Sequence, residues 1–407
     1  MNHSHAPSSE IAREFPPEPS APRHEVGDIF RHYGPAYRAT HALSFEQHKV
    51  MDAIEQCRTR ALGAHVDQCD HCGHTEISYN SCRNRHCGKC QGSQRIAWVE
   101  ARELELLPIQ YFHLVFTLPQ ELLPLSRFNP ALMYNLLFRA AADTLQTFAE
   151  KKWDARLGIT MVLHTWGQTL NEHPHVHCIV TGGALKNDGS AFVQAPKNFL
   201  FPVKALSRVF RAKYLAGLAA AWQSGSLKSA DFDLTDELAW QSFVAALARK
   251  DWVVYAKKTY DKPEHLVRYI ARYINRVAIS HHRILSIDHG RITFRYHDNR
   301  DDRDKIMTLS ADEFIRRFLT HVLPKGFRRI RYFGFLVNRQ RKNKLIRCRQ
   351  LLNLTDADKP YITDMDQYLT RLGIEPNLCP VCGQGTLQLV NVVLSFHDPP
   401  EGLRKVA

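Results

Sequence analysis

The crowding of cysteines toward one end constrains the fold of this 407-residue chain more than any other feature. Six of its ten cysteines fall between Cys57 and Cys90. Within that stretch Cys69 and Cys72 form one Cys-x2-Cys pair, and Cys87 and Cys90 form a second pair after 14 intervening residues. Two such pairs supply the four thiolates of a tetrahedral zinc site. We therefore predict one structural Zn2+ bound by these four cysteines, with no coordination position left open for catalysis.

Other potential ligands lie beside this site and near the C-terminus. Cys379 and Cys382 form a third pair with no partner pair nearby, and Cys348 is the only other cysteine within reach along the chain. The third pair is therefore either half of a zinc site or a relic. Near the first two pairs, Cys82 and His86 are possible substitute ligands. Cys57 is expected to lie too far away, on a helix.

The charge balance favours a polyanionic partner. The chain carries 54 lysines and arginines against 41 aspartates and glutamates, a formal net charge of +13, which fits nucleic acid better than a membrane. No run approaches the 18 consecutive apolar residues of a membrane span, and the first 15 residues do not resemble a secretory signal. We expect a cytoplasmic protein of a prokaryote, with reduced thiols, that acts at the nucleoid; nothing in the sequence indicates its oligomeric state.

Hydrophobic periodicity predicts a mixture of helices and strands without a regular βαβ alternation, which indicates an α+β fold with a central antiparallel sheet and flanking helices. The predicted elements are helices over 38–60 and 94–107, a strand over 111–119, a helix over 130–151, strands over 159–170 and 175–185, helices over 203–222 and 235–249, a strand over 251–258, a helix over 264–278, and a hairpin over 283–296 followed by a helix that Ser310 and Glu313 cap.

The hairpin formed by the strands over 159–170 and 175–185 carries the most reactive side chains. His175 and His177 alternate with a valine, so both imidazoles project from one face and can bind a divalent metal. If the turn is centred between residues 172 and 173, Gln168 lies opposite His177 and is the expected third ligand. His164 is the second choice, two cross-strand positions further along. The alternative is a set of surface histidines at the end of a hairpin.

The helix predicted over 264–278 carries two tyrosines and a basic strip. Tyr269 and Tyr273 are four residues apart, which places both phenols on one face of the helix. Such a pair often serves core packing, but Arg268, Arg272 and Arg276 on the same helix are suited to binding phosphate. A phenol has an ordinary pKa of about 10 and needs activation to act as a nucleophile. A cation at the histidines would provide it by polarising a phosphodiester.

Four segments together resemble the rolling-circle transposases of the insertion sequence 91 family over roughly residues 40–350. They are HPHVH (173–177), which is similar to the HUH motif of single-strand DNA nucleases, HTWGQ (164–168), YIARY (269–273) and YNSCRNRHCGKCQ (79–91).

The resemblance implies that His175 and His177 hold Mg2+ or Mn2+ and that Tyr269 and Tyr273 are paired nucleophiles that form a 5′-phosphotyrosine. It also implies an N-terminal zinc-binding domain and a catalytic antiparallel sheet with the tyrosine helix beside it. We accordingly divide the chain into a flexible leader, a zinc-binding domain, a catalytic domain and a tail with a Cys-x2-Cys pair: residues 1–25, 26–107, 108–350 and 351–407.

The segment 325–349 contains ten basic residues and no acidic one. Aromatic residues are interleaved with them, which pairs attraction for phosphate with surfaces on which unpaired bases stack. The alternative is a solvated basic face over a buried aromatic stripe. The residues of this segment that we expect to bind DNA are Arg328, Arg329, Arg331, Arg341 and Lys342, and the aromatics include Phe327, Tyr332 and Phe335.

The predicted function is therefore that of a metal-dependent DNA strand transferase that moves an insertion sequence. A plasmid replication initiator or relaxase would share the histidines and tyrosines, but the zinc domain and the YIARY segment favour a transposase. A histidine-triad nucleotide hydrolase would explain His173, His175 and His177 alone. A zinc-dependent DNA-binding protein without catalytic activity would be unaffected by loss of both tyrosines.

Overall fold

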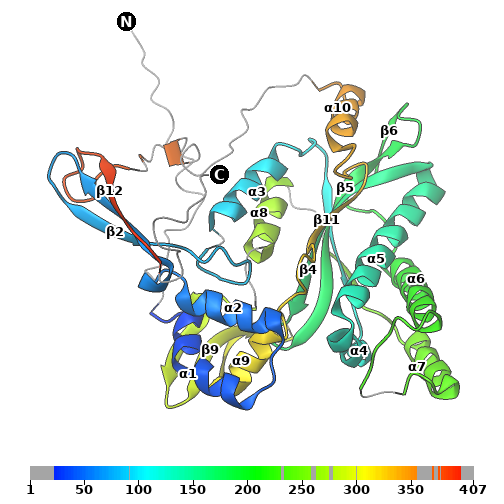
Figure 1. The fold of residues 1–407 in the computed structure, drawn as a ribbon. Helices are drawn as coiled ribbons and strands as arrows, with labels where there is room; N and C mark the ends of the chain where they lie inside the picture. The colour runs from blue at the N-terminus through cyan, green and yellow to red at the C-terminus, as the bar shows by residue number, and fades with distance from the viewer. Residues whose placement is uncertain are drawn as a thin grey trace, which may run out of the picture.

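A computed structural model describes residues 23–90, 92–230, 233–257, 263–274, 278–298, 300–354, 369–370, 375 and 377–395, excluding the side chains of 93, 257 and 272–274. Most of the predicted leader therefore lies outside the described residues. The fold is α+β with antiparallel sheets and flanking helices, as predicted (Figure 1). No helix in the described part of the chain is long and apolar enough to cross a membrane.

The central sheet has six strands in the order β11-β4-β5-β3-β7, with β6 paired to β5. All of these pairs are antiparallel. The three longest strands confirm strand predictions, whereas β11 falls within the basic segment, for which we predicted no strand. The bounds are Tyr111–Thr117 (β3), Ala155–Trp166 (β4), Glu172–Lys186 (β5), Phe192–Gln194 (β6), Val254–Lys257 (β7) and Ile330–Gly334 (β11).

Helices α4, α5, α6 and α7 cover one face of this sheet (Figure 1). Their apolar faces meet alternate residues of the central strands in the largest core, where Phe116 of β3 packs edge-on against Phe210 of α6 with ring centroids 5.0 Å apart. This face is therefore closed to substrate. The helices span Leu123–Phe128 (α4), Pro130–Trp153 (α5), Val203–Gln223 (α6) and Glu237–Arg249 (α7).

The opposite face of the sheet packs against α8 (Pro263–Ile274), which in turn contacts α3 (Gly92–Glu103). In α8 the residues Leu266, Val267 and Ile270 are buried at helical spacing, and they meet Val162 of β4 and Ile179 of β5. Because cross-strand partners project from the same face, the residues that alternate with Val162 and Ile179 also point toward α8.

A second core joins segments from both ends of the sequence. Helices α1 (Val26–Thr40) and α2 (Phe45–Gln56) pack against a three-stranded sheet of order β10-β9-β8 and against α9 (Ala311–Leu319). We predicted one helix over 38–60, but Ser44 begins a separate helix because its side chain and that of Gln47 cap each other's backbone amides. The predicted hairpin and the cap at Ser310 are confirmed: the strands are Ile284–Asp288 (β8), Arg291–Asp298 (β9) and Arg303–Ser310 (β10), and the Ser310 hydroxyl accepts the Glu313 amide.

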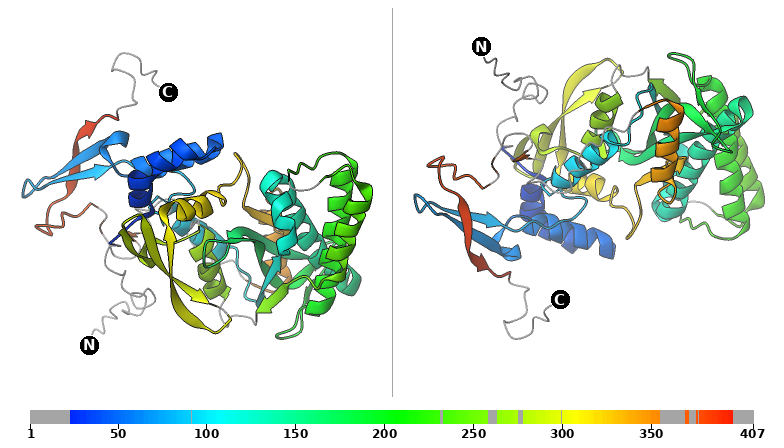
Figure 2. Two further views of the ribbon diagram at one scale, coloured as in Figure 1. Left: turned by 90° about the horizontal axis from the view of Figure 1, so that it is seen from below. Right: turned by 90° about the horizontal axis from the view of Figure 1, so that it is seen from above.

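A third sheet lies away from the helices α5 to α7 (Figure 2). It contains β1 (Ala64–Cys69), β2 (Thr75–Tyr79) and β12 (Leu387–Val393), in the order β12-β1-β2. The C-terminal strand therefore completes a sheet begun near the N-terminus. The helix α10 (Arg341–Leu351) follows β11 and packs through Leu345 and Cys348 against Leu185 and Phe335.

Candidate active site and zinc-binding cysteines

Three histidines meet on the face of the central sheet that packs against α8. His164 of β4 lies directly opposite His175 of β5, and His177 is two residues further along. One ring nitrogen from each lies within 4.8 Å of the others, and the two Nε2 atoms of His175 and His177 are 3.1 Å apart. We call His164, His175 and His177 the histidine cluster.

The prediction of Gln168 as third ligand is not supported, because Gln168 lies in the turn after β4 ends at Trp166. The turn is formed by residues 167–171 rather than at 172 and 173: the Gly167 amide donates to the Asn171 carbonyl at 2.8 Å. The earlier turn shifts the register, so that His164 and not Gln168 reaches His175 and His177. His164, the second choice for the third ligand, is thus the residue that joins His175 and His177.

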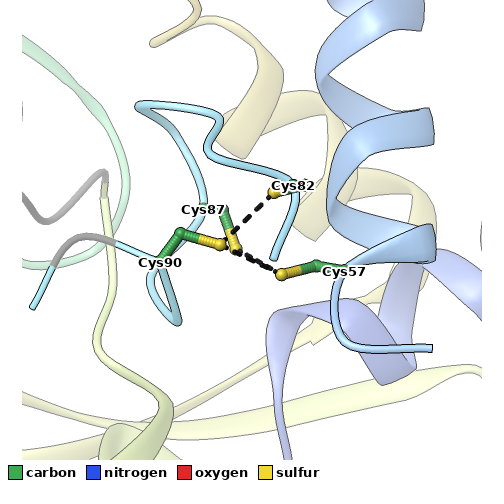
Figure 3. Close-up of side chains that lie close together, drawn as sticks. All are labelled: Cys57, Cys82, Cys87 and Cys90. Atoms are coloured by element: carbon green, nitrogen blue, oxygen red, sulfur yellow. Dashed lines mark hydrogen bonds between the residues drawn. The ribbon is translucent and has the colours of Figure 1, made fainter. Parts of the chain in front are cut away.

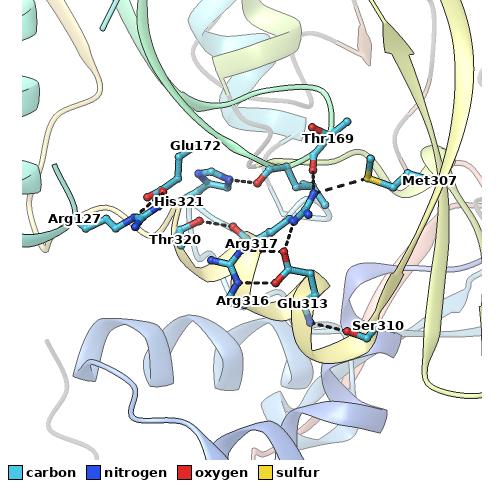
Figure 4. A network of polar contacts seen from close by, with 11 residues as sticks. Arg127, Thr169, Glu172, Met307, Ser310, Glu313, Arg316, Arg317, Thr320 and His321 are labelled. Atoms are coloured by element: carbon cyan, nitrogen blue, oxygen red, sulfur yellow. Dashed lines mark hydrogen bonds and ion pairs between the residues drawn. The ribbon is translucent and has the colours of Figure 1, made fainter. Parts of the chain in front are cut away.

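Side chains from distant segments hold this turn in place (Figure 4). The carbonyls of three successive turn residues each accept a hydrogen bond: that of Gln168 from Arg283, that of Thr169 from Arg317 at 2.9 Å, and that of Leu170 from His321 at 3.0 Å. Leu170 itself has a positive φ of 62° and is fully buried in the second core. The turn of the hairpin is therefore held by α9, by the residue two positions after it and by the segment before β8, and the local sequence does not reveal these contacts.

The imidazoles of the histidine cluster are in the form that binds metal. Burial lowers the pKa of His175 to about 3 and holds those of His164 and His177 well below the ordinary value, so all three are neutral at pH 7. The Nδ1 of His175 donates to the carbonyl of His173 at 2.6 Å, which leaves its Nε2 lone pair available.

The cluster also fits a divalent cation geometrically. Two ligands at about 2.1 Å from Mg2+ and at right angles to each other are about 3.0 Å apart. The separation of 3.1 Å between the Nε2 atoms of His175 and His177 matches this value. The Nδ1 of His177 lies 2.8 Å from the Nε2 of His113 in β3, a buried histidine that we did not identify from the sequence. A hydrogen bond from His177 to His113 would orient the His177 Nε2 toward the metal.

Tyr269 of α8 faces this group of histidines. Its ring centroid is 5.7 Å from that of His113, with the ring planes at 65°. Tyr273 lies one helical turn further along α8, and its side chain is outside the described residues. The structure therefore brings Tyr269 and the histidine cluster together through His113.

The predicted basic strip on α8 is only partly available for DNA. Arg268 forms an ion pair with Glu103 of α3, with Nε 2.7 Å from Oε1, so its charge is already compensated. The side chain of Arg272 and the whole of Arg276 lie outside the described residues. Arg268 thus fixes α8 to α3 rather than presenting a free cation to phosphate.

In the basic segment the predicted DNA-binding residues differ in their surroundings. Arg341 pairs with Glu105 at 2.9 Å and lies over the ring of Tyr332, whereas Lys342 is exposed. Arg331 lies 4.3 Å from the ring centre of Phe138. It lines a groove of about 540 Å3 together with the exposed Arg328, and the described residues that line this groove include Lys325 and no acidic residue.

The prediction that aromatic residues of this segment stack on bases is wrong for Phe327 and Phe335. Phe327 is 8% exposed and belongs to the core of the central sheet, and Phe335 is 4% exposed beside α10. The half-buried Tyr332 is engaged by the indole of Trp98 and by Arg102. Phe327 and Phe335 therefore fit the alternative interpretation of this segment, a solvated basic face over a buried aromatic stripe, better than they fit base stacking.

Arg329 is a predicted DNA-binding residue that lies beside the histidine cluster, since its carbonyl accepts the amide of Leu163, the neighbour of His164, at 2.9 Å. Its guanidinium is near enough to contribute to the lowered pKa of His164. Burial and the neighbouring Arg85 lower the pKa of Arg329 to about 10, which leaves it protonated at pH 7. Among the described residues no carboxylate forms an ion pair with Arg329, and the only charged neighbour that shifts its pKa is Arg85. A half-buried cation of this kind is suited to an anionic substrate group.

The cysteines form two clusters instead of the predicted single site. In the first cluster, Cys57, Cys82, Cys87 and Cys90 surround one point (Figure 3). The Sγ of Cys57 is 3.1 Å from that of Cys90 and 3.5 Å from that of Cys87, and Cys82 is 3.5 Å from Cys90. Cys57 was expected to be too distant, but α2 ends at Gln56 and Cys57 turns inward as its C-cap. His86 is excluded as a ligand because its ring bonds to Asn84 and to the Leu323 amide.

In the second cluster, Cys69 and Cys72 lie beside Cys379 and Cys382. The prediction that Cys69 and Cys72 share a zinc with Cys87 and Cys90 is therefore wrong, because β12 brings the C-terminal pair to the first pair. In each cluster the four Sγ atoms lie within 4.8 Å of one another, so each can supply the four thiolates of a structural Zn2+.

Comparisons with known proteins agree with these features. A family model described as "Transposase zinc-binding domain" matches residues 29–118, and one described as "Putative transposase" matches residues 158–344. The chain is 47% identical over 389 residues to "Putative transposase y4qJ" of Sinorhizobium fredii, covering 92% of this chain and 97% of that one. It is 32% identical over 334 residues to the "Transposase for insertion sequence element IS801" of Pseudomonas savastanoi pv. phaseolicola, covering 80% and 79%. No solved structure matches.

The fold, the cysteine clusters and these matches define a transposase with a zinc-binding domain, whose partner is DNA. The chain belongs to the IS91 family of transposases, as its motifs indicated.

Sequence reasoning missed two residues of these sites, His113 and Cys57. His113 is the single basic residue in the apolar strand β3, and that interruption was a usable signal. Its pairing with His177 depends on the strand order β4-β5-β3, which hydrophobic periodicity alone does not give.

Proposed function

We propose that this transposase cuts and rejoins single-stranded DNA through a 5′-phosphotyrosine and moves its element by rolling-circle transposition. The observation that carries the proposal is the convergence of the histidine cluster with Tyr269 on one face of the central sheet. A divalent metal, Mg2+ or Mn2+, held by His164, His175 and His177 would act there as a Lewis acid on the scissile phosphate. His113 orients His177, and α8 holds the nucleophile above the sheet.

In the proposed reaction the phenolate oxygen of Tyr269 attacks the phosphorus atom. The new P–O bond forms as the bond to the 3′ oxygen breaks, which yields a 5′-phosphotyrosine and a free 3′ hydroxyl that takes up a proton. The energy of the phosphodiester is retained in the tyrosyl ester, so rejoining needs no ATP. Tyr273, four residues along α8, is the second nucleophile, which serves transfer to the target strand.

The cationic residues of the proposed site bind the DNA backbone. Arg329 lies near the histidine cluster and binds the scissile phosphate or its neighbour. The groove lined by Lys325, Arg328 and Arg331 offers phosphate contacts to the adjoining strand. We place the reaction in the cytoplasm at the nucleoid, where both the DNA substrate and reduced zinc-binding thiols are found.

The proposal is tested with labelled single-stranded oligonucleotides from the ends of the element that encodes the chain, incubated with Mg2+ or Mn2+. Wild-type protein should give a shorter labelled strand and a protein–DNA adduct that resists denaturation. Both should vanish with His175→Ala and with the double variant Tyr269→Phe, Tyr273→Phe. The matched control is Tyr79→Phe, an exposed tyrosine of β2.

Two results would contradict the proposal. Cleavage that persists in the double tyrosine variant would show that neither phenol is the nucleophile. Cleavage that is equally fast with His175→Ala, or in the presence of a chelator, would show that the reaction needs no metal at the histidine cluster. Binding of the oligonucleotide without any cutting would favour a DNA-binding protein without catalytic activity.

A further inference from the structure

The sheet formed by β1, β2 and β12 adjoins the second cysteine cluster through Cys69 of β1, and its described residues form no hydrophobic core of their own. None of the four cores formed by described residues contains a side chain of these three strands. Large apolar side chains remain exposed on it, among them Ile77 (56%), Leu389 (61%) and Val392 (53%). We call residues 64–79 and 377–395 the terminal lobe. Three short strands without a buried apolar face are not stable by themselves, and domains of this size usually need a metal, disulfides or oligomerisation.

The four thiols of the terminal lobe have the spacing of a zinc tetrathiolate. The Sγ atoms of Cys69 and Cys382 are 3.7 Å apart, and so are those of Cys72 and Cys379. Four sulfurs at about 2.3 Å from zinc in a tetrahedron are about 3.8 Å from one another. The observed separations match a metal site and are too long for disulfide bonds.

The two cysteine pairs have the same local structure although they are far apart in the sequence. In each pair the residue after the second cysteine is a glycine with positive φ, Gly73 at 71° and Gly383 at 63°. The amides of these glycines donate to the carbonyls of Cys69 and Cys379 at 3.1 and 3.0 Å. Such tight turns direct further backbone amides at sulfur: that of Cys72 toward the Cys69 Sγ and that of Gly385 toward the Cys382 Sγ.

Contacts around the thiols fit the two halves of the terminal lobe to each other. The Asp70 carboxylate accepts the Thr386 amide at 2.8 Å and the side-chain amide of Gln388 at 3.2 Å. Gly385 is in close contact with the first pair, since a Cβ there would lie 2.4 Å from the Cys69 Sγ. The C-terminal pair is thus seated on the N-terminal pair rather than being a relic.

We infer that Cys69, Cys72, Cys379 and Cys382 bind a second structural Zn2+ that fastens the C-terminal segment to the N-terminal hairpin. Cys379 and Cys382 lie beyond both regions that match the transposase families, which end at residue 344. Because the lobe has no core, the free energy of zinc binding supplies most of the free energy that holds β12 against β1.

The charge of the terminal lobe argues that the second zinc joins the two segments of the lobe and does not bind DNA. Its two segments contain Asp67, Asp70 and Glu76 and neither lysine nor arginine, in a chain whose net charge is +13. A zinc tetrathiolate adds two further negative charges. The second zinc therefore has a structural role in joining the ends of the chain, and phosphate contacts belong to other surfaces.

The inference is tested on the full-length protein by counting zinc and measuring hydrogen exchange. Wild-type protein should contain two zinc ions per chain, and the double variant Cys379→Ser, Cys382→Ser should contain one. In that variant the amides of β12 should lose their protection, while those of β4 and β5 keep theirs, which shows that the body of the protein remains folded. The matched control is Cys348→Ser, a buried cysteine outside both clusters, which should retain two zinc ions.

A second variant keeps all four thiols. Gly385→Val places side-chain atoms against the Cys69 Sγ and should release one of the two zinc ions to a chelator before wild-type protein does. The inference is wrong if wild-type protein contains a single zinc, or if the double serine variant retains two. It is equally wrong if β12 stays protected after one zinc is lost.

Discussion

His113 offers a sharp test of how the histidine cluster is held in place. Its Nε2 lies 2.8 Å from the Nδ1 of His177, and its side chain is only 3% exposed. Replacing it with phenylalanine keeps an aromatic ring against Tyr269 and removes the hydrogen-bond partner of His177. The three residues of the cluster themselves are untouched.

The expected effect follows from the role of partners that hydrogen-bond metal-binding histidines. Loss of such a partner lowers metal affinity about 10- to 100-fold. This corresponds to about 1.4 to 2.7 kcal/mol of binding free energy. We predict the upper half of this range, because His177 is held in a largely buried environment in which no water readily replaces the lost partner.

The dissociation constant for Mn2+ can be measured by isothermal titration calorimetry on His113→Phe and wild-type protein. The control is His289→Phe, a histidine in the turn between β8 and β9 whose side chain is 92% exposed, and it should leave the dissociation constant unchanged. An unchanged affinity in His113→Phe, with binding abolished in His175→Ala, would refute the argument that His113 orients His177.

Three further predictions concern residues outside the cluster. Arg329→Met should weaken binding of single-stranded DNA and lower the slope of log affinity against log salt by about 0.7, without lowering the melting temperature, because no carboxylate loses its partner. Leu170→Ala should lower the free energy of unfolding in urea by about 2 to 5 kcal/mol, since Leu170 is fully buried. Gly334→Ala should lower that free energy by well over ~1 kcal/mol, because Gly334 has a φ of 64° and its Cβ would lie 1.7 Å from the Leu157 carbonyl oxygen. If any of these variants gives the same value as wild-type protein in its assay, the role given to that residue is wrong.

The parts of the fold that could be predicted depend on local patterns. The short apolar run of β3 and the helical spacing of Leu266, Val267 and Ile270 in α8 are legible in the sequence, because β3 is buried on both faces and α8 buries one face. The register of the β4–β5 hairpin is not local. Arg317 and His321 hold its turn from about 150 residues away in the chain, and the predicted metal ligand changed from Gln168 to His164 as a result.

The cysteine spacing shows a similar limit. A Cys-x2-Cys pair indicates half of a zinc site but not its partner. Nearness in sequence suggested pairing Cys69 and Cys72 with Cys87 and Cys90, whereas strand pairing of β1 with β12 brings in the C-terminal pair. Basic residues are likewise ambiguous, since an arginine such as Arg268 gives no sign in the sequence that Glu103 compensates its charge.

The central claim is that a tyrosine of α8 attacks DNA beside a metal held by the histidine cluster. Its most direct test is peptide mass spectrometry of the protein–DNA adduct after nuclease digestion, which locates the residue that carries the nucleotide. We predict a 5′-linked nucleotide on Tyr269 or Tyr273, formed only with Mg2+ or Mn2+ and absent from His175→Ala. A nucleotide on any other residue, or cut DNA with a free 5′ phosphate and no adduct, would contradict this account.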